Sequence, residues 1–98
     1  MNTINIFLRN DHFNQDGSQS VCIRLISNRR KKDVSLRIYV KHKDWDFKRN
    51  VVFKSDKDCE RKNKLIKKYK NKAINIVDEY FFKDENLTFD DFEKRLLI

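Results

Sequence analysis

The hydrophobic pattern of this chain changes its period once, near residue 55, and that change limits the folds open to it. Three stretches before this point alternate apolar and other side chains with a period of two: residues 4–9, 21–26 and 34–40. Such alternation is typical of strands with one buried face. Asp16-Gly17 is a turn signal between the first two stretches, and residues 28–33 join the second to the third. We therefore expect an antiparallel sheet with the second stretch in the middle.

After residue 55 the apolar residues recur at spacings of three and four, which is typical of one face of a helix about 24 residues long. The face comprises Cys59, Lys62, Ile66, Tyr69, Ala73, Ile76 and Tyr80. Ser55 is the predicted N-cap of this helix, with Asp58 as its capping-box partner. A second, shorter helix is predicted to begin at Thr88, with Asp91 as its partner. The predicted fold class is α+β: a three-stranded antiparallel sheet packed on a long C-terminal helix, with a short helix at the end.

A length of 98 residues suits one small domain. We expect residues 1–82 to form the sheet and the long helix, and residues 83–98 to form the short helix. The apolar end of the chain, Leu96-Leu97-Ile98, indicates a fragment cut at a domain boundary, so the short helix is expected to lead to a further domain. No apolar run approaches the roughly 20 residues that span a bilayer, and no signal peptide is visible.

The cysteines and histidines show no spacing typical of a metal site. These residues are Cys22, Cys59, His12 and His42. We therefore predict no metal and no cofactor, and a reducing, cytoplasmic setting. The histidines are interpreted as surface residues. Trp45 and the helix tyrosines are interpreted as core residues, and the acidic side chains after Thr88 as helix-capping groups rather than catalytic carboxylates. Nothing in the sequence indicates catalysis within these residues.

The positive charge of the chain is concentrated in one segment. The formal net charge is +8, and residues 21–54 alone carry eleven basic and three acidic side chains. A local excess of this kind attracts polyanions, such as nucleic acid, an acidic protein or an anionic membrane surface. The lysines of residues 57–72 are interspersed with acidic residues, so an ordinary solvated helix surface explains them equally well.

One face of the predicted sheet carries most of the informative side chains. If the regularly spaced Val, Leu and Ile residues face the helix, the opposite face shows Phe7, Arg9, Cys22, Arg24, Ile26, Ser35, Arg37 and Tyr39. We expect no acidic residue on it. Arginine presents a planar fork that fits phosphate oxygens or the acceptor edge of guanine, and a small β-sheet can enter the major groove of B-DNA. The segment Arg29-Arg30-Lys31-Lys32 is expected to extend the contact to flanking phosphates.

Two further classes of function stay open at this point. Arginine is also enriched at protein interfaces, so the same surface is compatible with an acidic protein partner. Phe7 and Tyr39 are compatible with base stacking in single-stranded RNA, although the aromatic, glycine-containing signature of sheet RNA binders is missing. Double-stranded DNA is the favoured partner.

In its order of elements the chain resembles the N-terminal arm-type DNA-binding domain of tyrosine recombinases, the integrases of phages and conjugative transposons. The resemblance rests on the turn at Asp16-Gly17, the strand Val21–Leu25, the basic hairpin, the strand Val34–Val40, the pair Trp45-Asp46 and the long helix, with Leu87–Phe92 resembling the helix that precedes the core-binding domain. Two positions depart from the family pattern, since Lys43-Asp44 lacks the usual proline before the Trp and Asn28 is followed by Arg29 instead of glycine.

The resemblance implies a non-catalytic module of a longer recombinase, whose sheet occupies the major groove of arm-type sites away from the crossover point. It implies Arg24, Arg37 and Tyr39 as the readers, with Arg9 and the hairpin residues Arg29, Arg30, Lys31 and Lys32 on phosphates. Partners would be double-stranded DNA and, through absent domains, other recombinase subunits. No membrane is implied.

Overall fold

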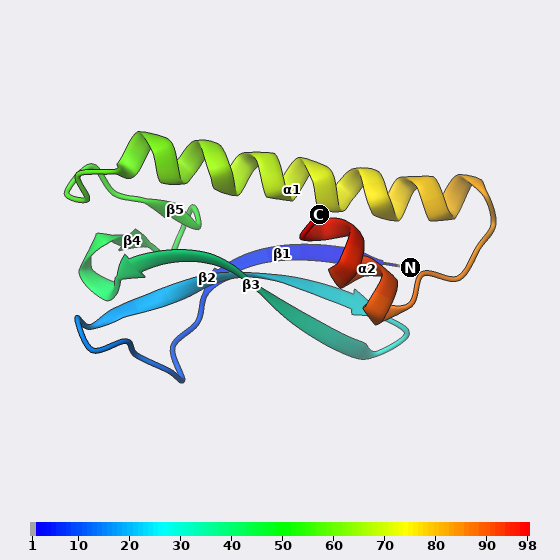
Figure 1. Ribbon diagram of the computed structural model, residues 1–98, viewed down its shortest axis with the longest axis horizontal. Coiled ribbons are helices and arrows are strands. Elements are labelled where there is room, and N and C mark those ends of the chain that lie inside the picture. The colour runs from blue at the N-terminus through cyan, green and yellow to red at the C-terminus, as the bar shows by residue number, and fades with distance from the viewer. Residues whose placement is uncertain (1) are drawn as a thin grey trace.

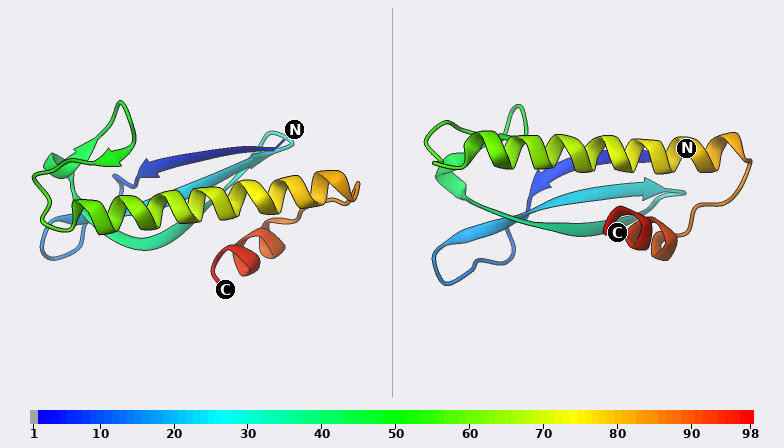
Figure 2. Two further views of the ribbon diagram at one scale, coloured as in Figure 1. Left: turned by 90° about the horizontal axis from the view of Figure 1, so that it is seen from above. Right: turned by 45° about the horizontal axis from the view of Figure 1, so that its top comes forward.

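A computed structural model describes residues 2–98 and shows one three-stranded antiparallel sheet with helices on one side of it (Figure 1). The strands follow the order β1-β2-β3, with bounds Thr3–Leu8, Ser18–Ser27 and Arg30–Lys41. A long helix, α1 (Cys59–Phe82), runs along the sheet, and a short helix, α2 (Phe89–Leu96), lies beside it (Figure 2). The predicted α+β class, the strand order and the length of the long helix are confirmed.

The side chains that alternate along β2 and β3 form the core beneath α1. Val21, Ile23 and Leu25 are fully buried, and the matching apolar residues of β3 are buried as well. On α1 the predicted stripe packs against them: Ile66, Ala73 and Ile76 are buried, and Cys59, Tyr69 and Tyr80 are partly buried against the same cluster. Burying each large apolar side chain contributes about 1.5–3 kcal/mol, so this two-layer core is the main source of stability.

The turn between β1 and β2 forms at Asp16-Gly17, as predicted. Gly17 has a φ of 83°, a conformation that residues with a Cβ adopt at a cost. Its N–H donates to the carbonyl of Asn14, at 2.9 Å. The Asp16 carboxylate accepts hydrogen bonds from both the N–H and the hydroxyl of Ser18, which closes the turn at the start of β2.

The connection between β2 and β3 is shorter than predicted. Strand β3 begins at Arg30, not at Val34, so the loop consists of Asn28 and Arg29 alone. Both have positive φ, 52° and 66°, which is the geometry of a two-residue type I′ turn. Such turns favour Asn-Gly, and with arginine in the glycine's place the sequence gives a weak signal. The predicted basic loop is therefore the beginning of a strand.

Strand β3 contains an irregularity that the sequence pattern does not reveal. Ser20 pairs with Tyr39 and Cys22 pairs with Ser35, so a single residue of β2 lies opposite three residues of β3. The middle one of these, Arg37, has a φ of 57°. Because two extra residues are inserted, the alternation between faces is the same on both sides of the bulge. The core pattern survives, while the strand bends and twists locally.

A small second sheet closes the end of the core near the start of α1. After a short 3-10 helix (His42–Asp44), strand β4 (Trp45–Asp46) pairs with β5 (Val51–Val52). Trp45 is only 2% exposed, which confirms its interpretation as a core residue. Asn63 of α1 accepts a hydrogen bond from the Val52 N–H at 2.9 Å, which joins this small sheet to the helix.

The predicted N-cap of the long helix is wrong. The helix begins at Cys59 with Asp58 at the N-cap position, and the Asp58 side chain makes no capping hydrogen bond. Ser55 instead donates its hydroxyl to Asp44 Oδ1, at 2.6 Å. Asp44 is 7% exposed, and a buried carboxylate without a donor is costly. The serine therefore supports the buried acid, and turns at Asp56 and Cys59 lead into the helix.

The short helix α2 is part of the same core. Thr88 is its N-cap and accepts a hydrogen bond from the Asp91 N–H at 3.1 Å, as predicted. Phe92 and Leu96 are both 0% exposed and belong to the cluster formed by the sheet and α1. Arg95 joins α2 to α1 through an ion pair with Glu79. Within residues 2–98, neither helix is long and apolar enough to cross a membrane.

Candidate nucleic-acid interface

Neither α1 nor α2 covers the sheet surface opposite α1, because both helices lie on the other side (Figures 1 and 2). We call this surface the open face. Pairing register and alternation place on it Asn5, Phe7, Cys22, Arg24, Ile26, Lys31, Asp33, Ser35, Arg37, Tyr39 and Lys41. The predicted readers Arg24, Arg37 and Tyr39 therefore share one surface.

Most of the predicted phosphate contacts lie around this face, with one exception. Arg9 directly follows β1 and is exposed, as are Arg29 and Arg30 at the hairpin end. Lys31 lies opposite Ile26 on the open face. Lys32 lies opposite the buried Leu25 and forms an ion pair with Glu93 of α2, with a distance of 3.6 Å. Lys32 therefore belongs to the helical side of the sheet rather than to the basic end of the hairpin.

The expectation of an acid-free face is wrong, because Asp33 lies on it directly opposite Arg24. The Arg24 Nε lies 2.7 Å from Asp33 Oδ1, and its Nη2 lies 3.1 Å from Oδ2, so the pair is bidentate. The hydrogen bond from Arg24 lowers the pKa of the Asp33 carboxyl, so the carboxylate is charged at neutral pH. The Arg24 guanidinium also lies 4.6 Å from the centre of the Phe7 ring, in a cation–π contact.

A second arginine is also paired, more loosely. Arg9 Nε donates to Asp11 Oδ1 at 2.7 Å, through a single hydrogen bond in an exposed position. This bond lowers the pKa of the Asp11 carboxyl. Two arginine–aspartate pairs thus flank a shallow hollow whose lining includes Phe7 and Cys22. Burial raises the pKa of the Cys22 thiol, so this cysteine is a neutral side chain in the floor.

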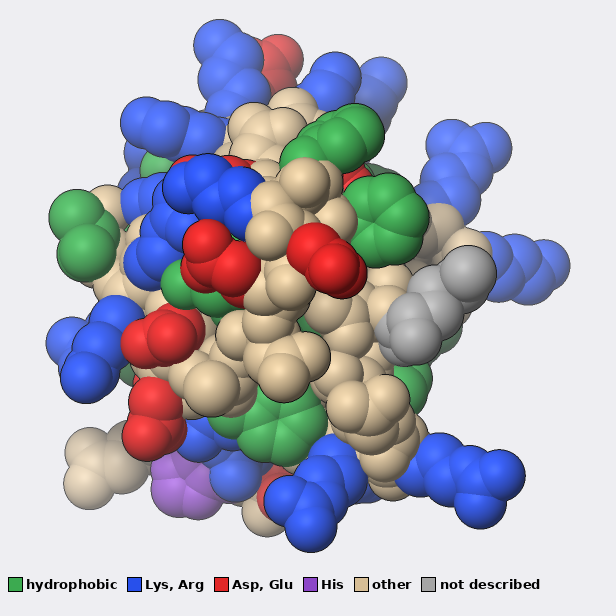
Figure 3. All heavy atoms as spheres, turned by 90° about the vertical axis from the view of Figure 1, so that its right-hand side faces the viewer, with side chains coloured by type: hydrophobic (Ala, Val, Ile, Leu, Met, Phe, Trp, Pro, Cys, Tyr) green, Lys and Arg blue, Asp and Glu red, His purple; other side chains and the backbone are tan. Residues whose placement is uncertain are grey.

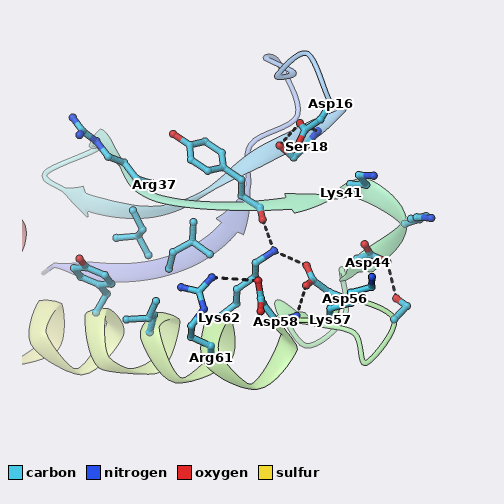
Figure 4. Close-up of a pocket in the computed structure, with 17 residues that line it drawn as sticks. Asp16, Ser18, Arg37, Lys41, Asp44, Asp56, Lys57, Asp58, Arg61 and Lys62 are labelled. Atoms are coloured by element: carbon cyan, nitrogen blue, oxygen red, sulfur yellow. Dashed lines mark hydrogen bonds and ion pairs between the residues drawn. The ribbon is translucent and has the colours of Figure 1, made fainter.

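Arg37 and Tyr39 are more exposed to solvent than Arg24. Figure 4 shows the Arg37 side chain pointing away from α1, and among residues 2–98 no carboxylate forms an ion pair with it. Tyr39 is 43% exposed on the same strand. Lys41 is also exposed on this face, opposite Ser18, so a cation that the sequence reasoning did not single out extends the surface.

The backbone beneath Tyr39 is anchored to the helix layer. Lys62 of α1 donates to the Tyr39 carbonyl oxygen at 2.8 Å and to Asp56 Oδ2 at 2.6 Å (Figure 4). The side chains of Lys62 and Asp56 are both largely buried. Burial raises the pKa of the Asp56 carboxyl, but the hydrogen bonds from Lys62 and the Asp58 backbone outweigh it, and the net shift is downward. This bridge holds the end of β3 at a fixed position relative to α1.

The hollow between this bridge and the start of α1 is lined partly by side chains that pair with one another, and partly by Arg37, Lys41, Lys43 and Lys57, which form no ion pair within residues 2–98. Asp56 pairs with Lys62, Asp58 pairs with Arg61, and Asp44 accepts from Ser55 (Figure 4). We interpret these three pairs as a structural junction at the start of α1. No group of three or more His, Cys, Asp or Glu residues among residues 2–98 is placed to hold a metal ion.

The charge also differs between the ends of the molecule. Figure 3 shows the end that carries α2 and the last turns of α1, where several acidic side chains gather while Lys and Arg side chains project around the rim. Residues 78–93, which include the last turn of α1 and the first turn of α2, contain seven acidic residues: Asp78, Glu79, Asp84, Glu85, Asp90, Asp91 and Glu93. The turn between β2 and β3 lies at this same end, where Asn28 and Arg30 line a hollow with Leu87 and Phe89, so acidic and basic side chains are both present there.

Sequence reasoning missed Asp33 because it misjudged the loop. In a two-residue turn at Asn28-Arg29, the residues equidistant from the turn are paired, and this places Arg24 opposite Asp33 and Cys22 opposite Ser35. The position numbers alone give these pairs once the turn is assigned. The missing glycine concealed the assignment, and with it the bidentate ion pair.

The strained turn gives a prediction that separates stability from charge. Replacing Arg29 by glycine relieves a positive φ that costs about 1 kcal/mol or more for a residue with a Cβ. We expect Arg29→Gly to raise the free energy of unfolding by about 1 kcal/mol, as measured by urea denaturation. Arg29→Ala removes the same charge but keeps the Cβ, so it should give no such gain. Equal stability of the two variants would contradict the turn geometry.

Comparison with known proteins gives one match. A family model described as the Arm DNA-binding domain matches residues 6–93, which include the second half of β1 and the whole of β2, β3 and α1. Neither the curated proteins nor the solved structures give a match to this chain. The matched segment also contains the first turn of α2 and every residue of the open face except those preceding residue 6.

Proposed function

The chain belongs to the family of Arm DNA-binding domains, and on that premise we propose that its open face binds double-stranded DNA sequence-specifically in the major groove. An Arm DNA-binding domain is a non-catalytic DNA-binding module. The observation that carries the finer proposal is the open face itself, where Arg24, Arg37 and Tyr39 stand together on a surface that neither α1 nor α2 covers.

The dimensions and chemistry of this face support the groove assignment. A two- or three-stranded ribbon fits the major groove, which presents a distinct set of donors and acceptors for each base pair. The exposed cations at the hairpin end and along β3, namely Arg29, Arg30, Lys31 and Lys41, stand where phosphates would flank the groove. The anchoring of β3 to α1 through Lys62 keeps this surface rigid, which lowers the entropy cost of binding.

The proposal extends to the protein around the domain. We propose that this module serves a tyrosine recombinase of the integrase type, acting on DNA in the cytoplasm. In that role the sheet binds arm-type sites, residues 83–98 lead toward a core-binding domain, and other domains contact further recombinase subunits. The resemblance in element order and the family assignment support this extension.

Salt dependence tests the proposed contact with the DNA backbone. If the face and its flanks contact about six phosphates, the logarithm of affinity should fall with the logarithm of salt concentration with a slope near −5. The measurement is a set of fluorescence-anisotropy titrations of duplex DNA at several salt concentrations. Double-stranded RNA of equal length is the control, because its deep, narrow major groove is closed to a sheet. A flat salt dependence, or equal affinity for both duplexes, would contradict the proposal.

A further inference from the structure

Arg24 is the most constrained arginine of the open face. Two hydrogen bonds to Asp33, at 2.7 and 3.1 Å, fix the orientation of the Arg24 guanidinium. The Phe7 ring, 4.6 Å away, supports it from one side of that plane. Arg9, by comparison, has a single hydrogen bond to its aspartate, at 2.7 Å. Among the arginines of this surface, Arg24 alone has its direction fixed by two different neighbours within residues 2–98.

The ion pair with Asp33 occupies only one of the two edges of the Arg24 guanidinium that can donate two parallel hydrogen bonds. A guanidinium has five N–H donors, and Asp33 occupies the edge formed by Nε and Nη2. The remaining edge, formed by Nη1 and the second N–H of Nη2, still carries two parallel donors. Such a fork matches the O6 and N7 acceptors that guanine presents in the major groove.

Electrostatics favour a base over a phosphate as the group that meets this edge. The charge of Arg24 is balanced by the Asp33 carboxylate, which lies within 3.1 Å and would repel a nearby phosphate. The acceptor edge of a guanine carries no net charge, so it meets the directed donors without that repulsion. Arg37 has no such partner among the described residues, which makes it the better ligand for a phosphate.

We propose that Asp33 and Phe7 are positioning residues that hold Arg24 to read a guanine in the major groove, while Arg37 contacts the DNA backbone. This inference rests on the proposed function of the open face. Asp33 would then contribute to sequence specificity, although its negative charge opposes DNA binding in general.

The variant Asp33→Asn tests this assignment, since asparagine offers one acceptor oxygen and cannot hold both donors of Arg24. A duplex library with a randomised central segment first supplies the preferred sequence of the wild-type domain, and a shuffled duplex of equal composition serves as reference. We expect Asp33→Asn to lower the ratio of the two affinities about tenfold, while binding to the shuffled duplex stays the same or strengthens. The second variant, Arg24→Lys, keeps the positive charge but lacks the two parallel donors of the guanidinium. It should lower the ratio of the affinities for the preferred and the shuffled duplex by a similar factor.

The matched control is Asp11→Asn, which removes a carboxylate from the other, single-bonded pair. It should strengthen binding to both duplexes equally and leave their ratio unchanged. A specific readout comes from 7-deazaguanine, which lacks the N7 acceptor. Placed at the contacted position, it should weaken binding by the wild type and have little further effect on Asp33→Asn.

The possible failures are distinguishable. If the selection enriches a sequence and Asp33→Asn keeps the wild-type ratio, the positioning role is overturned while specific DNA binding stands. If no sequence is enriched, the proposal of specific binding fails, and the guanine reader fails with it. Thermal unfolding of each variant shows whether a changed ratio belongs to a folded domain.

Discussion

Replacing both Arg24 and Arg37 by alanine is expected to weaken binding to duplex DNA at every salt concentration tested, by about a hundredfold at low salt. A lost bidentate base contact costs about 1–3 kcal/mol, and a lost phosphate contact adds to it. The double variant also leaves the Asp33 carboxylate without its partner on the surface that meets the DNA. Because we assign only Arg37 to the backbone, the salt slope should become shallower by about one. Fluorescence-anisotropy titrations against wild type measure both quantities.

The matched control for this variant removes the same charge from the helix layer. Lys67 and Lys70 are exposed on α1, on the side of the molecule away from the open face. Their replacement by alanine should lower affinity only slightly, through the long-range field. If the helix variant loses as much affinity as the sheet variant, the DNA is bound by α1 or by charge alone, and the open face is not the interface.

Replacing Phe92 by alanine is expected to lower the free energy of unfolding by about 3–5 kcal/mol. The side chain is 0% exposed and packs in the cluster formed by the sheet and α1, so its removal leaves a cavity beneath α2. A domain of this length is stabilised by roughly 5–15 kcal/mol, and the variant therefore loses a large share of its stability. Urea denaturation followed by circular dichroism measures the change.

Phe82 supplies the control for this substitution. It lies at the end of α1 and is 83% exposed, so Phe82→Ala makes the same chemical change without opening a cavity. Its effect should stay within about 0.5 kcal/mol. If both variants unfolded at the same urea concentration, α2 would not be packed in the core as the structure shows.

The elements of this fold could be predicted where the sequence carries a clean period. Val34, Leu36, Ile38 and Val40 alternate without interruption and are all buried. The stripe through Ile66, Ala73 and Ile76 runs at helical spacing and faces the sheet. In both cases one side of the element is buried along its whole length, so the period of the pattern follows directly from the geometry of the element.

The sequence-based prediction fails where no residue type in the sequence indicates the local backbone conformation or the hydrogen-bond partner. The type I′ turn at Asn28-Arg29 lacks the usual glycine, so the sequence predicts a longer loop and does not reveal that Arg24 pairs with Asp33. The bulge at Arg37 inserts two residues, so the alternation of buried and exposed residues continues without a break. Only a break in that alternation would have revealed the bulge in the sequence. Ser55 has the spacing of a helix cap, but a buried carboxylate, which sequence order cannot place, takes its hydroxyl.

The most direct test of the central claim is a titration of the domain with duplex DNA that records which backbone amides shift. A duplex obtained by selection, a shuffled duplex and double-stranded RNA are compared in turn. We expect the selected duplex to shift amides of β2 and β3 around Arg24, Arg37 and Tyr39, together with the turn at Arg29, and we expect the RNA not to shift them. Shifts confined to α1, or no response to any nucleic acid, would contradict it and would favour a protein as the partner of the basic surface.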